Sequence, residues 1–297
     1  MKNITNEELI LELKSRLKAG EDTSNEQADL MQQLQIVNKK LKDTEAVKSN
    51  FLSNIRNEIV NPFTSILGLS KSILQINNGN WDKVRTMISL IHSEAFDLDF
   101  QFKNIFTAAA IEAGDLFPDY ARVNVKMMIQ EVIDSFANRS EQKQISVQMV
   151  EDKNIEAEGF VTDPEKFQLI ISNLLSNAIK YSRAGGVVEI HTAMQDQSLQ
   201  VTVKDKGIGF DQSDENFIFN RFTQIDSGMT KSYAGHGLGL SIVKALTDNL
   251  NGEITVKSKK NQGSIFTLII PEGTSEEGEG KFSDFGNEIF FSDGEKF

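Results

Sequence analysis

Three polar segments in the second half of the chain combine amide, carboxylate and ammonium groups with glycines. The first contains Asn173, Asn177 and Lys180, whose spacings of four and three residues place all three on one face of a helix. Amide oxygens suit a Mg²⁺ ion that already carries phosphates, and an ammonium group suits the phosphates themselves. Taken alone, this set also fits a polar stripe that faces water.

The other two segments are rich in glycine. Asp205, Gly207 and Gly209 follow a predicted strand. Glycine there lets the backbone approach a ligand, and the carboxylate can accept a hydrogen bond from an amine such as that of adenine. The run 235–239 leads into a predicted helix, whose N-terminus offers free N–H groups to an anion. Each segment alone also fits an ordinary turn, but the order of all three favours a nucleotide site.

A different polar pattern lies in the first half of the chain. Asn57 and Asn61 are four residues apart and lie opposite an apolar seam, so both are predicted to face solvent or a partner. The amide nitrogen of Asn57 is not a useful nucleophile, because its lone pair is delocalised into the carbonyl group. Glu58 stands beside it. The alternative is a kinked helix with a polar outer face, since Pro62 removes one backbone hydrogen bond.

Two apolar seams predict the elements that carry this pattern. Apolar residues recur at intervals of three and four from Leu52 to Ile76 and again from Val84 to Ala109, with turn-forming residues at 77–80. Two such helices joined by a short turn form a helical hairpin. Because one hairpin cannot enclose both seams, we expect it to pair with a second copy in a homodimeric four-helix bundle.

From about residue 120 helices and strands alternate. Asp163 and Pro164 are a typical N-cap and first-turn residue for a helix that runs through Lys180. Other predicted helices cover 125–136 and 238–250, and predicted strands cover 145–149, 187–194, 199–204, 253–257 and 264–270. This is an α/β domain of about 150 residues, large enough for its own core. The expected fold class is α+β, a bundle hairpin followed by an α/β domain.

The order and spacing of these segments resemble the two-component sensor histidine kinases. In that family's Bergerat-type (GHKL) ATP-binding domain, an α/β sandwich, 173–181 resembles the N box, 205–209 the G1 box, 219–222 the F box and 235–239 the G2 box. The hairpin resembles the family's dimerisation and phosphotransfer bundle. The domains expected are a coiled-coil lead-in at 1–44, the hairpin at 45–115, the ATP-binding domain at 120–271 and an acidic tail rich in Phe and Gly at 272–297.

The resemblance implies a role for each matching residue. Asp205 would bind the adenine amine, Asn177 would hold Mg²⁺, and Thr267 would back the adenine. The ATP-binding residues that it implies are Asn173, Asn177, Lys180, Tyr181, Asp205, Gly207, Gly209, Lys231, Gly235, Gly237, Leu238, Gly239 and Thr267. The implied cofactors are ATP and Mg²⁺. The implied partners are a second copy and a response-regulator receiver domain or another histidine kinase.

The phosphoacceptor position departs from the family, because Asn57 stands where the family has histidine. By resemblance, Glu58 would be the general base, and Glu58 with Asn61 fits the pattern by which related kinases dephosphorylate a response regulator. One expectation is a signalling protein that does not autophosphorylate at this position. The alternatives are a response-regulator phosphatase or trans-acting kinase that uses Glu58 and Asn61, and a non-catalytic pseudokinase scaffold switched by ATP.

The composition of the chain excludes several classes of function. The formal net charge of −12 argues against general nucleic-acid binding, and the absence of cysteine excludes disulfides, thiolate zinc sites and cysteine nucleophiles. No apolar run reaches the length of a membrane span, so a cytoplasmic location is expected. Residues 272–297 hold eight acidic and two basic residues, half of the net charge. This tail is either a solvated terminus or a docking peptide for a basic surface.

Overall fold

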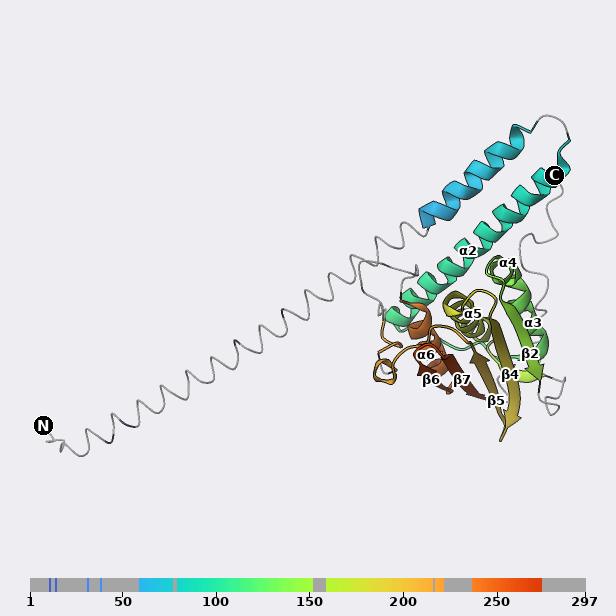
Figure 1. Ribbon diagram of the computed structural model, residues 1–297. Coiled ribbons are helices and arrows are strands. Elements are labelled where there is room, and N and C mark those ends of the chain that lie inside the picture. The colour runs from blue at the N-terminus through green and yellow to red at the C-terminus, as the bar shows by residue number, and fades with distance from the viewer. Residues whose placement is uncertain are drawn as a thin grey trace, which may run out of the picture. The chain divides into compact units, whose positions relative to one another are not determined.

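The computed structural model describes residues 59–76, 79–151, 159–215, 217–221 and 237–273, together with positions 11, 14, 31 and 38. The chain divides into two compact units, Met1–Ser53 and Asn54–Phe297. The hairpin and the α/β domain both belong to the second unit (Figure 1). The rest of the predicted coiled coil at 1–44 and the predicted tail from 274 onward lie outside the described residues.

The predicted hairpin is present. Residues 59–74 form its first helix, and α2 (Trp81–Ala113) forms its second. Asn80 caps α2, with its Oδ1 accepting a hydrogen bond of 3.3 Å from the backbone three residues later. Gly114 ends α2 in the left-handed conformation at φ +71°, where glycine is favoured. Over the ranges that the structure describes, no helix is both long enough and apolar enough to cross a lipid bilayer.

Within one chain, the hairpin leaves its apolar side chains only partly covered. Ser65 Oγ donates to Glu94 Oε1 at 3.3 Å and joins the two helices. Among the described seam residues of the first helix, Pro62 is buried and the others are half-buried. A second apolar stripe of that helix is more than half exposed; it consists of Val60, Phe63, Leu67 and Leu74. Such a stripe is typical of a helix that packs against a further partner.

The α/β domain contains a five-stranded sheet of order β2-β4-β5-β7-β6. β2 and β4 are parallel, and the other neighbouring pairs are antiparallel. The five strands are β2 (Ser146–Glu151), β4 (Val187–Gln195), β5 (Ser198–Lys204), β6 (Glu253–Lys259) and β7 (Gly263–Pro271). A small antiparallel sheet pairs β1 (Ala121–Val123) with β3 (Phe160–Thr162).

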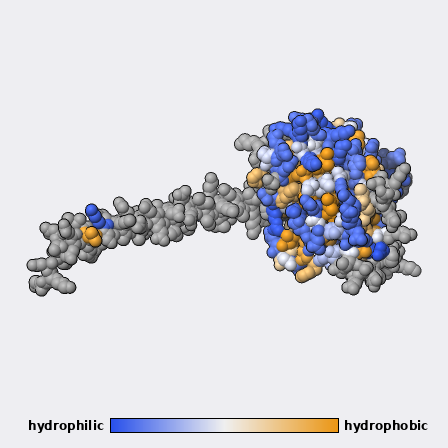
Figure 2. Space-filling view, turned by 90° about the horizontal axis from the view of Figure 1, so that it is seen from below, coloured by the Kyte–Doolittle hydropathy of each residue, from blue (hydrophilic) through white to orange (hydrophobic). Residues whose placement is uncertain are grey.

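Helices cover one face of the five-stranded sheet (Figure 1). They are α3 (Val125–Ser135), α4 (Ala137–Gln142), α5 (Pro164–Tyr181) and α6 (Gly239–Asn249), and a 3₁₀ turn, η1, covers Gln212–Asp214. Alternate strand residues face this core: Leu199, Val201 and Val203 of β5 are at most 1% exposed, whereas the residues between them are half-buried. Each such burial contributes about 1.5–3 kcal/mol. Figure 2 shows that hydrophobic and hydrophilic residues are interspersed on one face of the molecular surface.

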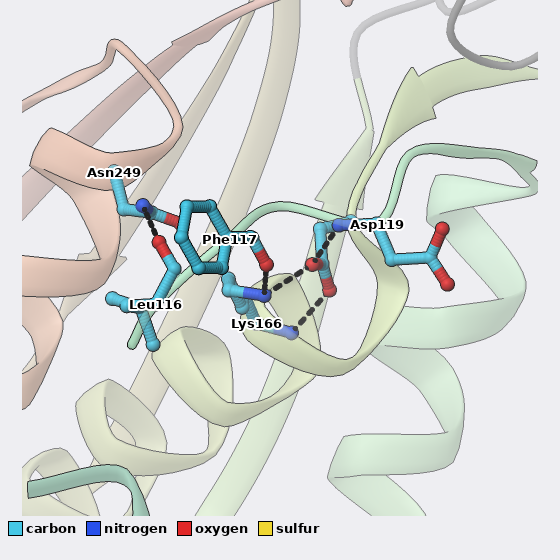
Figure 3. A network of polar contacts seen from close by, with 6 residues as sticks. Leu116, Phe117, Asp119, Lys166 and Asn249 are labelled. Atoms are coloured by element: carbon cyan, nitrogen blue, oxygen red, sulfur yellow. Dashed lines mark hydrogen bonds and ion pairs between the residues drawn. The ribbon is translucent and has the colours of Figure 1, made fainter. Parts of the chain in front are cut away.

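The linker between α2 and β1 is bonded to the start of α5 (Figure 3). Asp163, the N-cap of α5, accepts hydrogen bonds from Lys166 N at 3.0 Å and from Asp119 N of the linker at 2.8 Å. Lys166 Nζ pairs with Asp163 Oδ2 at 2.5 Å and donates to Phe117 O at 2.9 Å. One carboxylate therefore both starts the helix and holds the linker.

α6 supplies a second attachment for the same linker. Asn249, the last residue of α6, donates from Nδ2 to Leu116 O at 2.7 Å (Figure 3). Hydrogen bonds of this kind satisfy backbone groups of a segment that has no regular secondary structure. The linker is consequently fixed by α5 and α6, the two helices that carry five of the thirteen predicted nucleotide residues.

α2 also packs directly against the turn between α3 and α4. Phe136 is fully buried there, and the rings of Phe96 and Phe100 meet its ring edge-on at centroid distances of 5.2 and 5.6 Å. Beside these rings, Arg139 Nη2 lies 2.6 Å from Asp97 Oδ1. Burial raises the pKa of Asp97, and the charge and hydrogen bond of Arg139 oppose that rise.

Candidate functional site

Asp205 lies directly after β5, on the face of the sheet that the helices cover. Only 5% of the residue is exposed. Its Oδ1 accepts a hydrogen bond from Gly207 N at 2.8 Å, and its own N–H donates to Ser264 O at 2.9 Å. Burial raises the pKa of the Asp205 carboxyl group, and hydrogen bonds with the backbone of Gly207 and Ser264 oppose that rise. The structure thus holds a buried acceptor in a fixed orientation.

Close backbone contacts explain the glycines in the loop after β5. A Cβ atom on Gly207 would lie 2.2 Å from Tyr181 O, and one on Gly209 would lie 2.1 Å from Lys259 O. Gly209 also has a φ of +56°, in the region that favours glycine. Ile208 N donates to Tyr181 O at 3.1 Å. The loop is therefore bonded to the end of α5, next to the predicted polar face of that helix.

Asn177 and Lys180 occupy this polar face of α5. Asn177 is half-buried, and its Nδ2 lies 3.8 Å from the position that a Cβ atom on Gly239 would take, so it faces the start of α6. Lys180 is half-buried, with its Nζ 4.9 Å from the centre of the Tyr181 ring. One helix face therefore presents an amide and a cation close to the loop that holds the buried carboxylate.

Asn173, the third residue of this face, is bonded to the hairpin. It is 4% exposed, and its Nδ2 donates to Asn104 Oδ1 of α2 at 2.7 Å and to Leu169 O at 2.9 Å. Its Oδ1 would lie 2.7 Å from a Cβ atom on Gly239. Asn104 was not predicted from the sequence, although this buried residue contacts the predicted site directly.

The start of α6 is open to hydrogen bonding. Gly237 has a φ of +69°, and Leu238 occupies the N-cap position without a side-chain hydrogen bond to the helix. Among the described residues, the N-cap residue of α6 therefore leaves the first N–H groups without a side-chain bond, and these groups carry the positive end of the helix dipole. Gly235 and Lys231, which were also predicted to contribute, lie outside the described residues.

Thr267 does not lie beside Asp205. On β7 it is paired with Thr202 of β5, and the neighbours of Thr267 in the chain, Phe266 and Leu268, are the residues that face the helices. Its side chain is thus on the opposite face of the sheet from the buried carboxylate. The residue of β7 that meets Asp205 is Ser264, and alternation along the predicted strand 264–270 is the signal that identifies it.

Lys143 is a further cation that the sequence analysis did not identify. Its Nζ donates to Ile179 O at 2.9 Å and to Lys180 O. Burial lowers the pKa of Lys143, and the nearby charge of Lys180 lowers it further. An ammonium group there compensates the partial negative charge of the last carbonyl groups of α5. No local pattern reveals this role, because the partners lie 36 and 37 residues away.

Of the three predicted catalytic positions, the structure describes Asn61. Its side chain is exposed on the helix formed by residues 59–74, next to buried Pro62. Asn57 and Glu58 lie outside the described residues. The position of Asn61 agrees with a polar outer face on the first hairpin helix.

A known protein family matches the part of the chain that contains the predicted nucleotide residues. The family described as histidine kinase-, DNA gyrase B-, and HSP90-like ATPase matches residues 162–274. The match includes α5, the loop after β5 and the start of α6, and all thirteen residues predicted to bind the nucleotide lie within it.

Curated relatives carry histidine kinase names. The circadian input-output histidine kinase CikA of Synechococcus elongatus is 29% identical over 230 residues, which are 77% of this chain and 30% of the relative. The sensor-like histidine kinase SenX3 of Mycolicibacterium smegmatis is 29% identical over 228 residues, which are 77% of this chain and 58% of the relative. The chain thus spans less than two thirds of the length of these relatives.

A solved structure shares the fold. Full-length ShkA in complex with AMPPNP matches with a TM-score of 0.54 and 22% identity, over 75% of this chain and 46% of ShkA. The fold is thus an α/β sandwich of the ATPase type that follows a helical hairpin. Together with the matched ATPase family and the named relatives, it identifies this chain as a homologue of the two-component sensor histidine kinases.

Proposed function

We propose that this chain binds ATP with Mg²⁺ and signals in a two-component pathway without phosphorylating its own position 57. The observation that carries the proposal is the buried Asp205 acceptor, held by Gly207 in a loop that is bonded to the end of α5, the helix that carries Asn177 and Lys180. The ATPase family matched over 162–274 supports ATP as the ligand, and the histidine kinase names of the relatives support signalling.

The donor and acceptor groups present fit ATP. The exocyclic amine of adenine would donate to Asp205, whose burial excludes competing water. The phosphates would lie near Lys180 and the first N–H groups of α6, because both favour negative charge. Among the described residues, no cluster of three or more His, Cys, Asp or Glu side chains could hold a metal alone. Mg²⁺ would therefore be held by the phosphates and the amide oxygen of Asn177.

The acceptor position argues against self-phosphorylation. A phosphoryl transfer to position 57 requires a nucleophilic side-chain atom, and the amide of Asn57 does not supply one. The three histidines of the chain lie elsewhere: His92 is exposed on α2, His191 is on β4, and His236 lies outside the described residues. A response-regulator receiver domain or another histidine kinase is accordingly the partner that we propose for any phosphoryl chemistry.

Calorimetric titration with ATP and Mg²⁺ tests the nucleotide site. Wild-type protein should bind, and Asp205→Asn should weaken binding at least tenfold, because an amide can turn a donor toward the adenine amine. Incubation with γ-labelled ATP should leave the wild-type chain unlabelled, while Asn57→His should restore a nucleophile and an acid-labile label. A stable label on the wild-type chain would refute the proposal for position 57, and failure to bind ATP would refute the nucleotide site.

A second candidate function is dephosphorylation of a response regulator through Glu58 and Asn61. The exposure of Asn61 favours it, because an amide on the outer face of the hairpin can reach a docked receiver and orient a water molecule. The test compares the decay of a phosphorylated receiver domain with wild-type protein and with Asn61→Ala. Equal decay with wild-type protein, with the variant and without either would exclude this activity and favour the non-catalytic scaffold.

The exposed apolar stripe of the first hairpin helix supports a homodimer. Phe63 and Leu67 are 54% and 56% exposed, and Trp81 at the start of α2 is 76% exposed. A second copy of the hairpin would cover these side chains in a four-helix bundle. Sedimentation should show a dimer for the wild-type chain and a shift toward monomer for Phe63→Glu. A monomeric wild-type chain would exclude the dimer.

A further inference from the structure

The last four carbonyl groups of α5 are bonded by three different parts of the domain. Such groups have no partner within an α-helix, so they need one from elsewhere. Lys143 Nζ donates to two of them, Ile179 O at 2.9 Å and Lys180 O. Tyr181 O accepts from the loop after β5 at 3.1 Å, and the first of the four accepts from the backbone of the cap residue at 3.0 Å. Lys143 is the charged group among these partners.

The same end of α5 belongs to the candidate nucleotide site. Lys180 lies in its last turn and is the cation near which the phosphates are proposed to lie. Ile208 N, which donates to Tyr181 O, lies in the loop that begins with the buried carboxylate of Asp205. Lys143 therefore bonds a helix end that contacts both halves of the site.

This helix end is electrostatically unfavourable for a phosphate. The C-terminus of a helix carries the negative end of the macrodipole, which repels an anion that approaches Lys180. The half-buried ammonium group of Lys143 lies on the carbonyl groups that produce this negative charge. Burial and the nearby charge of Lys180 both lower the pKa of Lys143, so the two ammonium groups are close enough to interact. A polyanion between them would relieve their repulsion.

The backbone holds Lys143 in place at this helix end. Lys143 is the C-cap of α4, and its N–H donates to Arg139 O at 3.3 Å. Its carbonyl oxygen accepts from Gly185 N at 3.4 Å, in the turn that follows α5. The side chain thus starts from a point fixed on both sides, so its charge needs little ordering when a ligand binds.

We propose that Lys143 is a positioning residue of the ATP site, whose charge offsets the negative end of α5 so that the phosphates can lie beside Lys180. The inference rests on the proposed ATP site and adds a residue to it. Lys143 acts through the carbonyl groups that it contacts, not through the nucleotide. Its contribution should therefore depend on the charge of the ligand, and a ligand without phosphates should not detect it.

The first experiment compares two ligands that differ in charge. Calorimetry measures the affinity for ATP with Mg²⁺, and competition against ATP measures the affinity for adenosine. Lys143→Met should weaken ATP binding about fivefold, the factor that corresponds to about 1 kcal/mol for a charge at a helix end. The affinity for adenosine should change by less than about twofold, because adenosine carries no phosphate. Lys143→Arg keeps the charge and should restore the affinity for ATP.

Lys126→Met is the matched control, because Lys126 is an exposed lysine on α3. Its affinities for both ligands should equal those of wild type. Equal losses of ATP and adenosine binding in Lys143→Met would mean that Lys143 supports the fold alone, and would overturn the inference while the ATP site stands. Unchanged affinity for ATP would overturn it as well. A wild-type chain that binds neither ligand would overturn the ATP site and the inference together.

The second experiment tests whether Lys143 acts by its charge or only by placing the side chain of Lys180. Lys180→Met should weaken ATP binding, and Lys143→Met added to it should weaken binding again by about the same factor as in the wild-type chain. This additivity is expected because the negative end of α5 remains when Lys180 is absent. No further loss in the double variant would show that Lys143 acts through Lys180 alone, and would overturn the electrostatic role.

Discussion

Replacing Gly209 with alanine is the sharpest test of the loop that carries Asp205. The new Cβ atom would lie 2.1 Å from Lys259 O, and the backbone would keep a φ of +56°. The left-handed conformation costs a non-glycine residue about 1–2 kcal/mol, and forcing backbone apart costs about 1–3 kcal/mol more. We expect Gly209→Ala to lower the free energy of unfolding by about 3 kcal/mol. Urea unfolding, followed by circular dichroism, measures the shift of the midpoint.

Gly185 provides a matched control for this substitution. It also has a positive φ, +76°, but a Cβ atom there would meet no heavy atom within 4 Å. Gly185→Ala should therefore cost about 1 kcal/mol, because the strain is partly offset by the lower entropy of the unfolded alanine chain. The difference between the variants isolates the contact with Lys259. Equal losses for the two would refute the close approach of the loop to the end of β6.

Three other substitutions test separate parts of the domain. Because burial raises the pKa of Asp205, the folded state keeps the proton on this carboxyl group at pH values where the unfolded chain has lost it. The free energy of unfolding should therefore fall as the pH rises from the usual pKa to the raised pKa. Asp205→Asn should abolish that fall, as measured by urea titrations at several pH values. Asp163→Ala should cost about 2 kcal/mol, because it removes both the cap of α5 and the bond to Asp119 N, whereas exposed Glu165→Ala should leave the melting temperature nearly unchanged. Lys143→Met should cost about 1–3 kcal/mol in urea unfolding, because the carbonyl groups at the end of α5 lose their donor.

Local patterns in the sequence predicted the main elements well. The seams predicted both hairpin helices, and Asp163 with Pro164 predicted the start of α5, because a cap and a period of 3.6 residues are set within one or two turns. The strands β1 and β3 were not predicted. Each has three residues, too few to display an alternating pattern, and their pairing joins residues about 40 positions apart.

The candidate site was predictable where its residues are close in sequence. Asp205 with its glycines and the face of α5 are local patterns, and the structure brings Asp205, Gly207 and the end of α5 together. The contact of Asn104 could not be predicted, because its partner, Asn173, is 69 residues away. No local spacing distinguishes a helix face that packs on a domain from one that faces solvent. Thr267 was misplaced by family resemblance, although alternation along the strand places Ser264, on the other face, beside Asp205.

The bonds that hold the linker also determine where the hairpin could turn relative to the domain. Leu116, Phe117 and Asp119 are each bonded to α5 or α6, so the hairpin would turn at Gly114, whose left-handed backbone ends α2. α2 would then rotate as a rigid helix about Gly114. Asn104 lies about 15 Å and Phe96 about 27 Å along the helix from Gly114. A rotation of roughly 10° would move these residues by about 3 and 5 Å, which exceeds the tolerance of a hydrogen bond at the first and of a ring contact at the second. A small rotation of the hairpin would thus be enough to separate both contacts.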